Sequence, residues 1–153
     1  MNLLAATVLA ALPIHGTFFP GKSLGGVRLG ATPAQVQRAW GTRHGVCGSC
    51  AHLTWYFNYA RYQPQGAGVE FRNGRVVAVF TLWQPSGWRV PNGLRMGDPA
   101  GEIERRYGSM VRVGCGTYDA YIATQRDTST AYYVFNKRVW GFGLNRPFVS
   151  VCR

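Results

Sequence analysis

The chain is poor in the residue types that most hydrolytic active sites require. Among 153 residues there are six acidic residues and three histidines, and the formal net charge is +11. A glycosidase needs two facing carboxylates, and Glu70 with Asp119 is the one pair that occupies comparable predicted strand regions. No set of residues supplies a nucleophile, a base and an orienting group together. We therefore predict that the protein is not an enzyme and has no cofactor.

The chain also lacks a hydrophobic run long enough to span a bilayer comfortably. The N-terminal run MNLLAATVLAALPI is uncharged and has the length of a signal-peptide core. We predict a leader over residues 1–19 and no membrane span in the mature chain. The alternative is a buried first strand over residues 3–12.

A repeated segment organises the rest of the chain. Residues 26–41 (GVRLGATPAQVQRAWG) and 93–108 (GLRMGDPAGEIERRYG) align without a gap at an offset of 93 − 26 = 67 residues. Each copy predicts a short helix with a proline near its start, a glycine at its end and one apolar stripe. Thr32 and Gln35 form a capping-box pattern in the first copy, and Asp98 is the expected cap in the second.

Strand patterns follow each predicted helix. Asn73-Gly74 and Asn136-Lys137 lie between aromatic and β-branched runs, as in β-hairpins. The predicted fold class is α+β, with two tandem helix-plus-antiparallel-meander modules and the helices packed on one face of the sheet. The predicted boundaries are a leader over 1–19, a first module over 20–83, a linker over 84–92 and a second module over 93–153.

The four cysteines all follow the predicted leader, and an even number in a small exported domain is typical of disulfides. Cys47 and Cys115 occupy equivalent positions after the two helices, so each is expected to bridge within its own module. This predicts the pairs Cys47–Cys50 and Cys115–Cys152. Zinc bound with two nearby histidines and thiol-redox chemistry remain alternatives for the first pair. We expect no metal, because an oxidising compartment favours the disulfide.

The motif from Gly26 to Gly41, repeated from Gly93 to Gly108, resembles the tandem repeats of the beta-lactamase-inhibitor-protein (BLIP-like) fold. It also resembles the related small outer-membrane lipoprotein domains of the SmpA/OmlA kind. The resemblance implies a fold and, by analogy alone, a hydrolase inhibitor. The chain departs from the inhibitors in its basic charge and closely spaced first cysteine pair. It departs from the lipoproteins in having no cysteine near its N-terminus.

Tyrosines and arginines supply the candidate binding surface. Alternation along the predicted strands places Tyr56, Tyr121 and one of Tyr132 or Tyr133 on the sheet face away from the helices. Aromatic residues and arginine are enriched in protein-binding surfaces. The predicted binding residues are Tyr56, Tyr121, Tyr132, Arg72 and Arg75.

These features predict a secreted or cell-envelope monomer that binds a protein or an anionic envelope component without catalysis. The positive charge favours an anionic partner, whereas export and the absence of a recognition motif argue against nucleic acid. The alternatives are a small envelope thiol-redox or other enzyme that uses Cys47 and Cys50, and a hydrolase inhibitor by fold analogy. Residues 16–23 match a P-loop pattern, but the glycines that follow oppose the helix that such a loop needs.

Overall fold

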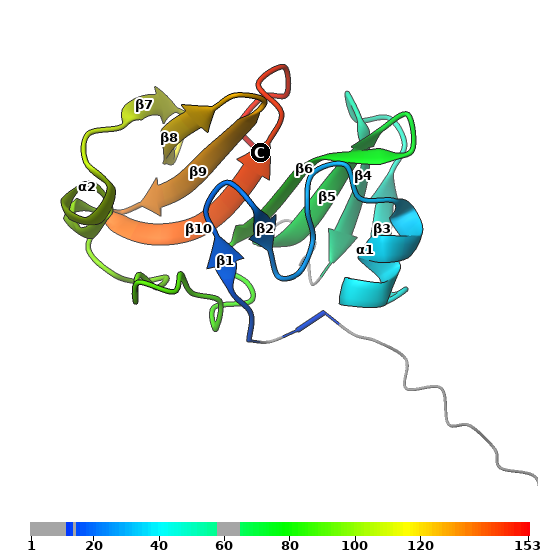
Figure 1. Ribbon diagram of the computed structural model, residues 1–153, viewed down its shortest axis with the longest axis horizontal. Helices are drawn as coiled ribbons and strands as arrows, with labels where there is room; N and C mark the ends of the chain where they lie inside the picture. The colour runs from blue at the N-terminus through cyan, green and yellow to red at the C-terminus, as the bar shows by residue number, and fades with distance from the viewer. Residues whose placement is uncertain (1–11, 14, 58–64) are drawn as a thin grey trace, which may run out of the picture.

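The structure is a computed structural model that describes residues 12–13, 15–57 and 65–153 (Figure 1). Most of the predicted leader, and the predicted strand residues 58–62, lie outside these ranges. The helices are α1 (Pro33–Trp40) and α2 (Gly101–Tyr107). The strands are β1 (Phe18–Phe19), β2 (Ser23–Leu24), β3 (Gly45–Cys47), β4 (Leu53–Phe57), β5 (Gly66–Arg72), β6 (Arg75–Leu82), β7 (Val111–Gly114), β8 (Asp119–Gln125), β9 (Thr128–Phe135) and β10 (Arg138–Asn145).

Eight of the strands form one antiparallel sheet in the order β3-β4-β5-β6-β10-β9-β8-β7. The two four-stranded halves join where β6 pairs with β10. The β5–β6 and β9–β10 hairpins turn at Asn73-Gly74 and Asn136-Lys137, where both were predicted. All four turn residues have positive φ angles, which a tight two-residue hairpin turn requires.

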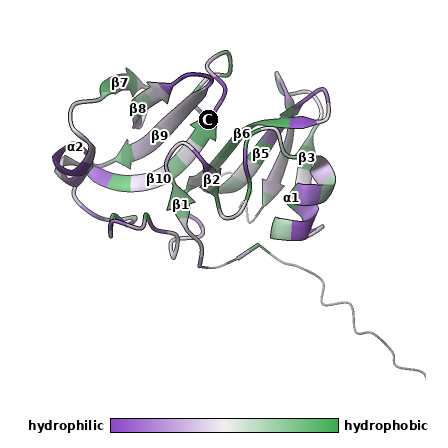
Figure 2. Ribbon diagram, in the orientation of Figure 1, coloured by the Kyte–Doolittle hydropathy of each residue, from purple (hydrophilic) through white to green (hydrophobic). Residues whose placement is uncertain are grey.

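The predicted α+β fold class is wrong, because the structure is mostly β. The helices α1 and α2 have eight and seven residues, and their buried residues are Val36 and Trp40 in the first and Ile103 in the second. Figure 2 shows hydrophilic colouring over most of α2. Helices this short and polar cannot cover an eight-stranded sheet. The prediction also missed the short outer strands β3 and β7, which widen each half from three strands to four.

One face of the sheet, here called the hairpin face, is covered mainly by the β1–β2 hairpin and by the segment between the two halves. Figure 1 shows β1 and β2 in front of the middle of the sheet. Phe18 stacks on Phe142 of β10 with ring centroids 5.0 Å apart. Trp88, in the predicted linker, is fully buried, and its ring centroid lies 5.4 Å from that of Trp40. Phe18 therefore belongs to the core, although the predicted leader extends to residue 19.

The opposite face, here called the tail face, is covered by the C-terminal segment, residues 146–153. Tyr133 donates a hydrogen bond to the Val151 carbonyl oxygen at 2.8 Å. The Cys115–Cys152 disulfide fastens the same segment to the end of β7. The middle of the sheet is therefore covered on both faces, and an open sheet face of the kind the sequence suggested is not present there.

The four cysteines form two disulfides, Cys47–Cys50 and Cys115–Cys152. The prediction of disulfide bonds is confirmed. None of the helices in the described ranges is long and apolar enough to cross a membrane.

The two helices begin differently. At α1 the backbone N–H of Gln35 donates to Thr32 Oγ1 at 3.2 Å, and the backbone N–H of Thr32 donates to Gln35 Oε1 at 2.9 Å. These two bonds form the predicted capping box. At α2 the N-cap is Ala100, which makes no side-chain cap bond. Asp98 instead accepts a hydrogen bond from the Arg95 amide at 2.8 Å. The predicted cap at Asp98 is wrong because this carboxylate closes the preceding turn.

Candidate functional site

The tail face contains a pocket of about 170 Å³, bordered by the Cys47–Cys50 loop and by the C-terminal segment. Its floor comes from β4, β5 and β6. Thr54 lies directly opposite Glu70 in the antiparallel ladder, and Glu70 lies opposite Ala78. Residues opposite each other in neighbouring strands share a face of the sheet. The register therefore places Glu70 in the floor, beneath the C-terminal segment.

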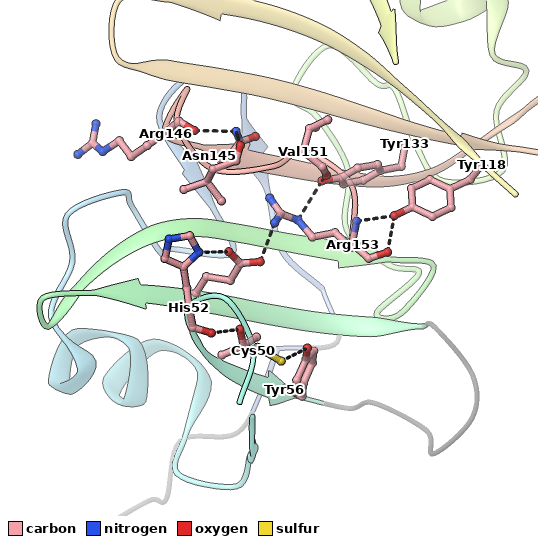
Figure 3. A network of polar contacts seen from close by, with 12 residues as sticks. Cys50, His52, Tyr56, Tyr118, Tyr133, Asn145, Arg146, Val151 and Arg153 are labelled. Atoms are coloured by element: carbon pink, nitrogen blue, oxygen red, sulfur yellow. Dashed lines mark hydrogen bonds and ion pairs between the residues drawn. The ribbon is translucent and has the colours of Figure 1, made fainter. Parts of the chain in front are cut away.

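Glu70 and Arg153 both line this pocket and form an ion pair. Figure 3 shows Arg153 with its polar contacts as dashed lines. Arg153 Nη1 lies 2.7 Å from Glu70 Oε1, and the two side chains are only 3% and 15% exposed. His52 Nδ1 lies 3.5 Å from the other carboxylate oxygen. The Arg153 guanidinium also lies 4.9 Å from the centre of the Phe80 ring. A carboxylate thus lies between a guanidinium and an imidazole, in a largely dehydrated setting.

Arg153 keeps its charge in this setting. Burial lowers the pKa of Arg153, but its interactions with Tyr133 and Glu70 outweigh burial, so the pKa is raised overall. Burial also raises the pKa of the Tyr133 and Tyr118 hydroxyls. Arg153 Nη2 has no hydrogen-bond partner among the described residues. A buried guanidinium that stays charged depends on its counterion, which here is Glu70.

The wall of the pocket next to the first disulfide contains Cys50 and Tyr56. Cys50 Sγ lies 3.8 Å from the Tyr56 hydroxyl. Thr54 Oγ1 donates to the His52 carbonyl oxygen at 2.9 Å and so anchors the loop. Cys47 is the last residue of β3 and Cys50 lies in the loop before β4, so Cys47 is not at a helix N-terminus. The helix dipole that lowers thiol pKa values in many Cys-x-x-Cys redox sites is therefore missing here.

The structure does not bring the predicted binding tyrosines together. Tyr56 is half-buried on the tail face, whereas Tyr121 and Tyr132 lie on the hairpin face and are only 8% and 1% exposed. The prediction of an exposed surface containing all three is wrong. Alternation shows which residues of one strand share a face, but it does not relate strands of the two halves. Tyr133 shares the tail face with Tyr56 and is fully buried.

Arg72 and Arg75 are both exposed at the β5–β6 turn, but their side chains reach different parts of the molecule. The Arg72 guanidinium lies 5.0 Å from the centre of the Phe148 ring, in the C-terminal segment. Arg75 Nη1 donates to the Gly30 carbonyl oxygen at 3.3 Å, in the loop before α1. Phe148 is 59% exposed. Arg72 thus lies against the segment that covers the tail face, and Arg75 does not.

Sequence reasoning missed Arg153 and Phe148, which lie in the C-terminal segment and follow no strand or helix period. The predicted Cys115–Cys152 bridge was the available signal, because it fastens this segment to the sheet. The carboxylate pair considered from the sequence is separated: Glu70 is on the tail face, whereas Asp119 pairs with Val134 on the hairpin face. Within the described ranges, no three His, Cys, Asp or Glu side chains are grouped to hold a metal ion.

Comparisons with known proteins support the fold alone. No protein-family model and no curated protein matches the chain. An extracellular protein containing an SCP domain from Bacillus anthracis str. Ames aligns with a TM-score of 0.56 and 12% identity, over 78% of this chain and 44% of that one. The uncharacterized protein yfeY from Escherichia coli aligns with a TM-score of 0.52 and 11% identity, over 86% of this chain and 99% of that one. This chain spans less than half of the SCP-domain protein.

Proposed function

We propose that the protein is an extracytoplasmic, non-catalytic binding protein that contacts an acidic protein partner through the surface formed by Arg72, Phe148 and the Tyr56 side of the tail-face pocket. The observation that carries the proposal is the pairing of an exposed guanidinium with a phenyl ring that is 59% exposed. Arginine and aromatic side chains dominate the energetics of many protein interfaces. An exposed phenylalanine beside an arginine therefore supports a protein-binding role for this surface.

The distribution of charge supports an acidic partner. Four of the six carboxylates, those of Glu70, Glu102, Glu104 and Asp127, pair with arginines of the same chain. Arg72 has no carboxylate partner among the described residues. Because most of the negative charge is neutralised internally, the remaining arginines dominate the outer field. Such a field accelerates the encounter with an acidic surface.

Two observations support the proposed compartment. Both disulfides join residues of a small domain, and such bonds persist in oxidising environments outside the cytosol. One of the proteins with a similar fold is described as extracellular.

The pocket itself favours binding over catalysis. Its volume of about 170 Å³ is below the ~300–1,000 Å³ of ordinary small-molecule sites. Its most buried charges, on Arg153 and Glu70, neutralise each other. The geometry suits a single side chain of a partner better than a substrate. Thiol-redox chemistry at Cys47 and Cys50 remains the alternative function.

A photo-cross-linking experiment tests this proposal. A photoreactive phenylalanine analogue replaces Phe148 in one variant and Phe135 in the matched control. Phe135 is also exposed, at 44%, but lies at the end of β9 in the β9–β10 hairpin. After irradiation in the envelope fraction of the source organism, we expect a discrete protein adduct from position 148. Arg72→Glu should abolish it, and Arg126→Glu on the exposed β8–β9 turn should not. Equal adducts from both positions, insensitive to Arg72→Glu, would contradict the proposal.

A further inference from the structure

An open groove of about 530 Å³ lies between α1 and the loop before it, apart from the tail-face pocket. Arg28 reaches it from the loop and Arg38 from the helix, and both side chains are exposed. Gly26 and Gly30 shape the loop with φ angles of 84° and 83°, which glycine adopts without strain. The chain thus places two guanidinium groups along one concave surface.

The surroundings of this groove add positive charge, and the nearby carboxylate of Asp127 is paired with Arg146. Neither Arg28 nor Arg38 has a carboxylate partner in the described part of the chain. Arg75 donates to the Gly30 carbonyl oxygen. Arg146 also lies close to Gly30, since a Cβ atom added to Gly30 would be 3.6 Å from Arg146 Nη2. This arginine is the one paired with Asp127. Three guanidinium groups without a carboxylate therefore lie around the Gly26–Ala31 loop.

The second copy of the repeated segment shows how the same helix neutralises its arginine. At the offset of 67 residues, Arg38 corresponds to Arg105 and Gln35 to Glu102. Glu102 Oε1 accepts a hydrogen bond from Arg105 Nε at 2.9 Å, and Arg105 Nη2 lies 2.5 Å from Glu102 Oε2. Gln35 has no charge and its Oε1 is used by the capping box. One glutamine thus leaves the first copy with an uncompensated arginine.

We propose that this groove binds an organic phosphate, with Arg28 and Arg38 contacting the phosphate oxygens. A phosphate monoester has about −1.5 to −2 charges near neutral pH, which matches two guanidinium groups, whereas a carboxylate matches one. Guanidinium groups bind phosphate through two parallel hydrogen bonds. The groove volume lies within the ~300–1,000 Å³ of small-ligand sites, and so leaves room for the organic part of the ligand.

Calorimetric titration with glycerol 3-phosphate tests the inference, with glycerol as the uncharged reference ligand. We expect saturable binding that Arg38→Ala weakens about tenfold or more, as expected for losing a charged hydrogen bond. Gln35→Glu should weaken it similarly, because it introduces the acid that the second copy carries beside Arg105. Glutamate can also complete a capping box, so the melting temperature of this variant should not fall. Arg105→Ala in the second copy should leave binding unchanged.

The source of the phosphate is distinguished by a second arm. Co-sedimentation with vesicles of phosphatidylcholine containing phosphatidic acid, against phosphatidylcholine alone, tests a lipid headgroup. Binding to phosphatidic acid vesicles but not to glycerol 3-phosphate, lost in Gln35→Glu, would assign the groove to a lipid headgroup. Binding to glycerol 3-phosphate alone would assign it to a soluble phosphate. No binding in either arm, or equal weakening by Arg105→Ala, would overturn the inference.

Discussion

The buried pair of Glu70 and Arg153 provides the sharpest test of how the tail face is held together. Glu70→Gln keeps the shape of the side chain and removes the charge opposite a guanidinium whose side chain is 3% exposed. Removing one partner of a buried ion pair costs ~3–5 kcal/mol, because the other charge is left uncompensated. We expect about 3 kcal/mol, the low end of this range, because Glu70 is 15% exposed and Arg153 keeps its contact with Tyr133.

The assay is reversible denaturant unfolding with both disulfides intact, which reports the free energy of unfolding. For a chain of this size, about 3 kcal/mol corresponds to a fall in melting temperature of roughly 6–12 °C. The matched control is Glu104→Gln. Glu104 pairs with Arg112 at 2.9 Å, but these side chains are 32% and 60% exposed. Breaking this exposed pair should lower the free energy of unfolding by less than about 1 kcal/mol.

A double variant separates loss of charge pairing from loss of packing. Arg153→Met together with Glu70→Gln removes both charges and keeps apolar contact with Phe80, so it should be more stable than Glu70→Gln alone. If Glu70→Gln destabilises no more than Glu104→Gln, the pair does not hold the C-terminal segment. The reasoning about the tail face would then be refuted.

The remaining predictions concern the Glu102–Arg105 ion pair and the two disulfides. The Arg105 guanidinium donates a hydrogen bond to Glu102 and lowers the pKa of Glu102 from 4.5 to about 2. The contribution of this ion pair to the stability of the fold is therefore fully present above pH 4.5 and is lost as the pH falls toward 2. An NMR titration of the Glu102 carboxyl carbon should show this low midpoint, and Arg105→Ala should raise it; an unchanged midpoint would count against the pair. Replacing Cys115 and Cys152 by serine opens a loop of 37 residues and should cost about 4 kcal/mol from chain entropy. Replacing Cys47 and Cys50, which are 3 residues apart, should cost about 1.5 kcal/mol by the same relation; equal losses from the two bonds would contradict this account.

Local structure could be predicted from the sequence wherever residues close together in the chain determine it. The Asn73-Gly74 turn requires positive φ angles that few other residue pairs adopt, and Thr32 with Gln35 can satisfy each other's amides without help from elsewhere. The disulfide pairing followed from the equivalence of Cys47 and Cys115 in the two copies. These features depend on residues within a few positions, or on the repeat.

The features that failed depend on contacts between distant strands. Tyr121 was assigned to the wrong face because only the β6–β10 pairing decides how the two halves align. The strands β3 and β7 are three and four residues long, too short for alternation to reveal. Arg153 has no pattern of its own and reaches Glu70 only because the C-terminal segment folds across the sheet. The candidate site is therefore largely a product of tertiary structure.

The most direct test of the proposed binding role is the cross-linking yield at position 148 with and without the Arg72→Glu substitution. The account predicts a discrete protein adduct at position 148 that disappears in the Arg72→Glu background and has no counterpart at position 135. An adduct at position 148 whose yield does not change with Arg72→Glu would contradict it.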